Sequence, residues 1–159
     1  MSLPRTVASL LLVGLGTLAF AQDKPAISAP DSVWMIVSTA LVLLMTPALA
    51  LFYGGMVRKK NVLNTMMLSF VMMGLVSVIW VLIGYSLTFG KSSNGFIGSL
   101  EYAFGNNISA TEPFGTQTIP AMLFMLFQMK FAIITPALIS GAIAERVRFN
   151  AYVVFMTLW

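Results

Sequence analysis

Two phenylalanines, Phe127 and Phe131, stand four residues apart in a long apolar stretch of the sequence. On an α-helix, residues i and i+4 lie one turn apart on the same face, so both rings can be presented to one target. The face of an aromatic ring carries negative electrostatic potential and attracts a small cation with about 0.5 to 2 kcal/mol. The pair therefore suits either a cation site or a hydrophobic gate, and the competing interpretation is plain packing between helices.

The other residue types limit the chemistry that this sequence can perform. It contains no His, no Cys and only five carboxylates, and it has no Gly-rich loop for phosphate. Because these residues form no recognisable catalytic or metal-ligand constellation, the sequence predicts no enzyme activity, no metal site and no cofactor. A channel or transporter needs less, namely a vestibule, a recognition site and a constriction.

The composition indicates a membrane protein. Hydrophobic residues make up 58% of the sequence and charged residues 9%, and the mean hydropathy is +0.91. Soluble domains carry about 25% charged residues. The net charge of +4 does not indicate nucleic-acid binding, because the cations form no basic patch with interleaved aromatics.

The first part of the sequence has the pattern of a secretory signal. Arg5 precedes an apolar core that ends in Ala19-Phe20-Ala21, so we expect a cleaved signal peptide over residues 1–21. The alternative is a retained first transmembrane helix, for which the apolar run is short. Cleavage would leave residues 22–31 as an extracytoplasmic tail, followed by a membrane domain over residues 32–159.

Uncharged runs predict helices at about 32–57 and 61–90, and further apolar runs predict a third helix at about 119–144 and the start of a fourth at 149–159. At about 1.5 Å per residue, each of the first three is long enough to cross a bilayer. Cytoplasmic loops carry more Lys and Arg, which predicts a mature N-terminus outside. The inner cations would be Arg58, Lys59, Lys60, Arg146 and Arg148, and the outer ones Lys24 and Lys91.

Three segments resemble the ammonium transporter family, which includes the Amt, Mep and Rh proteins. The third apolar helix contains FQMKFAIITPALISGAIAERVRF at 127–149, which is similar to the third helix of that family. The segment MTPALALFYGGMVRKKNVL at 45–63 resembles the end of its first helix and the following turn. The segment WVLIGYSLTFG at 80–90 resembles the outer end of its second helix.

The resemblance implies an all-α, polytopic transmembrane bundle of eleven helices, built from two inverted repeats and assembled as a homotrimer. This sequence would hold the first three helices and the start of the fourth. It also implies ammonium transport across the inner or plasma membrane, and a PII-type signalling protein as partner at the cytoplasmic face. The central histidine pair of the family has no counterpart in this sequence, which lacks His.

The resemblance also assigns roles to particular residues. Phe127 and Phe131 match phenylalanines that contribute to the outer ammonium site and cap the pore. Leu49, Phe52 and Tyr53 match positions at the inner pore mouth, although Phe52 and Tyr53 also suit an interfacial aromatic belt. The alternatives are an ammonium sensor of the same fold, an Rh-like gas channel, or a fragment that does not fold alone.

Two features are open to more than one interpretation. Thr46-Pro47 and Thr135-Pro136 each free a carbonyl four residues before the proline, at Leu43 and Ala132, either for the pore or only as a packing kink. Lys130 lies near the middle of the third helix, where a charge is costly, so we expect it to meet a carboxylate or to extend toward the membrane surface. A position facing the pore would weaken the transport hypothesis.

Near the inner end of the third helix, small residues predict a close approach between helices. Next to them, Glu145 and Arg146 predict a local ion pair with a structural role. The small residues are Ser140, Gly141, Ala142 and Ala144.

Overall fold

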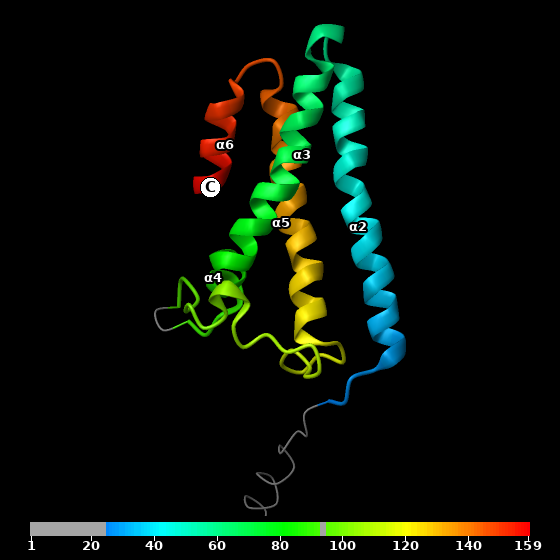
Figure 1. The fold of residues 1–159 in the computed structure, drawn as a ribbon, viewed down its shortest axis with the longest axis vertical. Coiled ribbons are helices and arrows are strands. Elements are labelled where there is room, and N and C mark those ends of the chain that lie inside the picture. Colours follow the sequence, from blue (N-terminus) through cyan, green and yellow to red (C-terminus); the bar gives the residue numbers. More distant parts are fainter. Residues whose placement is uncertain (1–24, 93–94) are drawn as a thin grey trace, which may run out of the picture.

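The computed structural model describes residues 25–92 and 95–159. The expected signal peptide over residues 1–21 lies outside the described residues. Within the described part, long helices run side by side, with the connection after the first helix and the connection before the last at one end (Figure 1). The expectation of an all-α fold is confirmed, since residues 25–92 and 95–159 hold isolated β-bridges but no strand.

The first span is helix α2 (Ala29–Met56), which begins earlier than the expected residue 32. Ser28 is its N-cap and accepts a hydrogen bond from the Asp31 backbone N–H at 3.4 Å, and a proline occupies the first turn. Both features favour helix initiation, which explains the earlier start. A short 3₁₀ turn, η1 (Lys59–Asn61), then reverses the chain.

The second span consists of three parts. Helix α3 (Val62–Ile79) leads into a π-helical segment, η2 (Trp80–Gly84), and then into helix α4 (Tyr85–Phe89). The whole stretch matches the predicted span 61–90. The π-helical segment was not predicted, because nothing in the letters WVLIG marks it.

The outer connection contains a 3₁₀ turn, η3 (Ala103–Gly105), and leads to helix α5 (Ala121–Ile143). The first N–H groups of a helix have no partner within it. Here the loop supplies partners, since the Ala121 N–H donates to the Glu112 carbonyl and the Met122 N–H to the Ser109 carbonyl, each at 3.0 Å. Helix α6 (Phe149–Leu158) follows α5.

Helices α2, α3 and α5 pack against one another, and α6 packs against α3 (Figure 1). A buried apolar cluster joins α3 to α6 and contains Leu68, Met72, Tyr152 and Met156. Three helical stretches are long and apolar enough to cross a membrane, namely Ala29–Met56, Lys59–Phe89 and Ala121–Ile143. Many large apolar side chains on them are exposed, as expected of surfaces that meet lipid or further helices.

Candidate functional site: an aromatic pair above an uncovered stripe of helix α5

Phe127 and Phe131 contact each other on α5. Their ring centroids lie 5.1 Å apart with the planes at 75°, an edge-to-face arrangement. Phe127 is half-buried and Phe131 is 46% exposed. The two rings therefore lie on one face of the helix, as the spacing predicted, and one face of the pair is left uncovered by the described helices.

Below the pair, one stripe of α5 is left uncovered by the other described helices. The exposed residues Phe131, Thr135, Leu138 and Ala142 follow helical spacing along this face, whereas Ile133, Ala137 and Ser140 are buried on another. The Thr135 hydroxyl donates to the Phe131 carbonyl at 3.0 Å. The polar hydrogen of this exposed residue is therefore already hydrogen-bonded within the helix. From Phe131 to Leu138 the stripe extends about 10 Å along the helix.

The inner aromatic residues border the lower end of this stripe. Phe52 is 60% exposed, and its ring centroid lies 5.6 Å from that of Tyr53. The Tyr53 hydroxyl donates to the Leu138 carbonyl at 3.4 Å, which places Tyr53 against α5. Leu49 lies one turn earlier on α2 and is half-buried. Of the three inner residues, Tyr53 contacts α5 directly, and Phe52 packs against Tyr53.

Tyr53 reaches α5 because Gly141 has no side chain. A Cβ atom at Gly141 would lie 2.5 Å from ring carbons of Tyr53. The predicted close approach is confirmed at Gly141. Ser140 is buried, and Ala142 is exposed among the described helices.

Lys130 points away from the stripe. Successive helical residues are rotated by about 100°, so Lys130 lies about 60° from Phe127 and about 140° from Thr135 around the axis. The residue is half-buried, and no ion-pair partner for it occurs among residues 25–92 and 95–159. Whether Lys130 meets a carboxylate or extends toward the membrane surface stays a prediction.

A cavity of about 290 Å³ lies beside Phe127, between the outer ends of α2 and α5. Asp31 and Trp34 of α2 line it together with Phe124 and Gln128 of α5. The sequence reasoning missed this grouping, because it placed Asp31 in the tail before the first helix.

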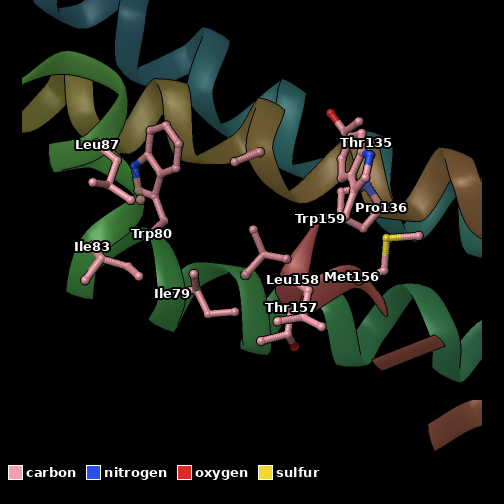
Figure 2. Close-up of a pocket in the computed structure, with 13 residues that line it drawn as sticks. Ile79, Trp80, Ile83, Leu87, Thr135, Pro136, Met156, Thr157, Leu158 and Trp159 are labelled. Atoms are coloured by element: carbon pink, nitrogen blue, oxygen red, sulfur yellow. The ribbon is translucent and has the colours of Figure 1, made fainter. Parts of the chain in front are cut away.

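A second cavity, of about 420 Å³, lies between η2, α5 and α6 (Figure 2). Ala132, Thr135 and Pro136 line it. Because Pro136 has no N–H, the Ala132 carbonyl loses its usual helical partner at this cavity. The Pro136 carbonyl is used differently, since it accepts a hydrogen bond from the Tyr152 hydroxyl at 2.7 Å. The Thr135-Pro136 segment therefore contacts α6 through the Pro136 carbonyl and also borders the cavity.

At the inner end, Glu145 does not form the predicted local pair with Arg146. Its carboxylate instead lies 3.2 Å from the Arg58 Nε atom and accepts a hydrogen bond from the Asn61 side chain at 2.7 Å. The bond from Asn61 and the bonds from Arg58 lower the pKa of Glu145 to about 2. The backbone at Glu145 has a φ of 63°, which turns its side chain toward these partners.

Comparisons with known proteins show which family this chain is similar to. A putative ammonium transporter of Methanothermobacter thermautotrophicus is 47% identical over 135 residues, which cover 84% of this chain and 33% of the relative. An ammonium transporter of Bacillus subtilis is 52% identical over 129 residues, covering 81% of this chain and 32% of the relative. The chain therefore spans about a third of the length of these curated relatives.

Solved structures agree with the sequence matches. The crystal structure of Candida albicans Mep2 superposes with a TM-score of 0.75 at 32% identity, over 89% of this chain and 31% of Mep2. Mep2 of Saccharomyces cerevisiae gives a TM-score of 0.74 at 32% identity, with 89% and 32% covered. The curated relatives are named as transporters, which are not enzymes, so the expectation of a non-enzyme is confirmed. The sequence model of the Ammonium Transporter Family matches residues 33–159, and this polytopic membrane chain belongs to that family.

Proposed function

We propose that the protein carries ammonium or ammonia across a membrane and that Phe127 and Phe131 form part of its outer cation site. The observation that carries this proposal is the edge-to-face pair at the top of the uncovered α5 stripe. Exposed ring faces suit a small cation, and the rings can also close a narrow passage. The names of the relatives support ammonium as the solute.

The rest of the path follows the stripe. A solute that leaves the aromatic pair would pass Thr135 and Leu138 and reach Leu49, Phe52 and Tyr53 at the inner end. Apolar walls favour the uncharged form, because an ion loses its hydration there at high cost. The outer rings would bind the cation, and the stripe would pass the neutral species.

The wider setting belongs to the same proposal. The distribution of Lys and Arg supports an inner or plasma membrane location with the mature N-terminus outside. The family resemblance supports a homotrimer and a PII-type partner at the cytoplasmic face. Arg58, Lys59 and Lys60 are exposed at that face and offer positive charge to such a partner.

The proposal can be tested with the complete gene in a strain that lacks its own ammonium transporters. We expect the wild type to restore growth at low ammonium, and Phe127→Ala together with Phe131→Ala to reduce it strongly. Phe70→Ala is the matched control, because Phe70 is exposed on α3 and lines neither the 290 Å³ nor the 420 Å³ cavity. A correctly inserted wild type that fails to restore growth would contradict transport and favour an ammonium sensor.

A further inference from the structure

The cavity beside Phe127 has the composition of a cation site. Its wall includes one carboxylate, three aromatic rings and two side-chain amides, from Asp31, Trp34, Phe124, Phe127, Gln117 and Gln128. No Lys or Arg is among the described residues that line it. Carboxylates, ring faces and amide oxygens all attract cations, so this composition disfavours an anion.

The Asp31 carboxylate is held in a fixed position. The Thr118 hydroxyl donates to its Oδ2 atom at 2.6 Å, and the Ser28 backbone N–H donates to the Thr118 carbonyl at 2.8 Å. These bonds join the start of α2 to the loop that precedes α5. An ionised carboxylate has about four acceptor positions, so the bond from Thr118 leaves others for a ligand. The group is exposed and is charged at neutral pH.

We propose that this cavity is a recruitment subsite for ammonium, in which the Asp31 carboxylate supplies the charge and Trp34 and Phe127 supply ring faces. The inference rests on the proposed transport function and adds a position before the Phe127 and Phe131 pair. Phe127 belongs both to that pair and to the wall of this cavity, so a cation can pass from one to the other along a single ring.

Charge and rings contribute to different steps. An exposed carboxylate acts over about 8 Å at physiological ionic strength, whereas a ring face acts only at contact. Asp31 therefore raises the local concentration of the cation, which affects KM and leaves the maximal rate unchanged. Because mobile ions screen an exposed charge, its effect decreases as the salt concentration rises.

Asp31 could instead be only a clamp for the loop, and two substitutions separate these roles. Asp31→Asn keeps an oxygen that can accept the Thr118 hydroxyl hydrogen bond but removes the charge. Thr118→Val removes that hydrogen bond but keeps the charge. Glu112→Gln is the matched control, because Glu112 is an exposed carboxylate of the same outer loop that lines a different cavity.

The experiment measures initial uptake of ¹⁵N-labelled ammonium by cells that express the complete protein. The ammonium concentration is varied at low and at high ionic strength, set with N-methylglucamine chloride so that no small inorganic cation competes. At low ionic strength we expect Asp31→Asn to raise KM about two- to five-fold, the range for one exposed charge interaction. The maximal rate stays unchanged and the difference shrinks at high ionic strength. Thr118→Val, which keeps the charge but loses the bond that positions it, raises KM less than Asp31→Asn does, and Glu112→Gln keeps the wild-type KM.

An unchanged KM for Asp31→Asn, in a strain where the wild type takes up ammonium, would overturn this inference alone. An equal loss of maximal rate in Asp31→Asn and Thr118→Val would also overturn it, because that result assigns Asp31 to the clamp. No uptake by a correctly inserted wild type would overturn the proposed function, and the inference would fall with it.

Discussion

The carboxylate of Glu145 lies 3.2 Å from the Nε atom of Arg58, and this ion pair ties the segment after α5 to the turn after α2. The same carboxylate also accepts a hydrogen bond from the Arg58 backbone N–H at 3.1 Å. One side chain therefore connects two inner loops that are far apart in the sequence. The charged contact of Glu145 therefore joins two separate loops and does not form within one loop.

The link through Glu145 should depend on pH in a narrow acidic range. Asn61 and Arg58 lower the pKa of Glu145 to about 2, whereas a free glutamate titrates near about 4.3. A lowered folded-state pKa contributes stability that is complete above about pH 4.3 and is lost as the pH falls toward about 2. We expect Glu145→Gln to lower the Tm of the purified protein by a constant amount above pH 5.

Below that pH, the difference in Tm between the wild type and Glu145→Gln should shrink. Glu101→Gln serves as the control, because the Glu101 side chain is outside this link. A difference in Tm that stays constant down to pH 2.5 would show that the carboxylate charge does not stabilise the inner loops.

The contact between Tyr53 and Gly141 predicts a steric effect of one methyl group. Gly141→Ala would place a Cβ atom 2.5 Å from the Tyr53 ring, and overpacking of this kind costs about 1 to 3 kcal/mol. We expect Gly141→Ala to lower the Tm in detergent. Adding Tyr53→Leu to the same chain removes the ring that the new methyl group meets, so it should restore most of the lost Tm. Gly74→Ala is the control, since nothing lies within 4 Å of that position, and it should be neutral or slightly stabilising.

Ser86 should control the order of the outer loop. Its buried hydroxyl donates to the Ser99 carbonyl at 2.7 Å and accepts from the Tyr102 backbone N–H at 2.9 Å. Ser86→Ala leaves both groups without this partner, at a cost of about 1 to 3 kcal/mol. Hydrogen exchange of the Tyr102 amide should therefore become faster. Thr88→Ala, whose hydroxyl bonds only within its own helix, should leave that exchange rate unchanged.

The helices could be predicted from the sequence because long apolar runs bounded by Gly, Lys or Arg determine them almost alone, even where Lys130 lies inside the third run. The three spans in the structure differ from the predicted ranges by a few residues. The π-helical segment Trp80–Gly84 could not be predicted, because it differs from an α-helix in hydrogen bonding and not in residue type. The partner of Glu145 was predicted to be Arg146, its neighbour in the sequence. The true partner, Arg58, comes close only when the chain folds.

The candidate site was predictable to a similar degree. The spacing of Phe127 and Phe131 is enough to predict that their rings lie on one face, since both residues belong to one helix. Asp31 was missed because the sequence placed it in the tail before the first helix, whereas the helix begins at Ala29. Its link to the cavity depends on Thr118, which only the folded loop brings to α2.

The π-helical segment rotates the side chains that follow it around the axis of the second span. A π-helical turn holds about one residue more than an α-helical turn, so every residue after Gly84 is rotated by about 100° relative to a continuous α-helix. This rotation applies to Tyr85, which is buried with its ring centroid 5.6 Å from that of Tyr102. The span can thus present one face to α6 and a different face to the outer loop. A single-residue deletion within Trp80–Gly84 would rotate the residues that follow, so that Tyr85 would no longer face the loop that contains Tyr102.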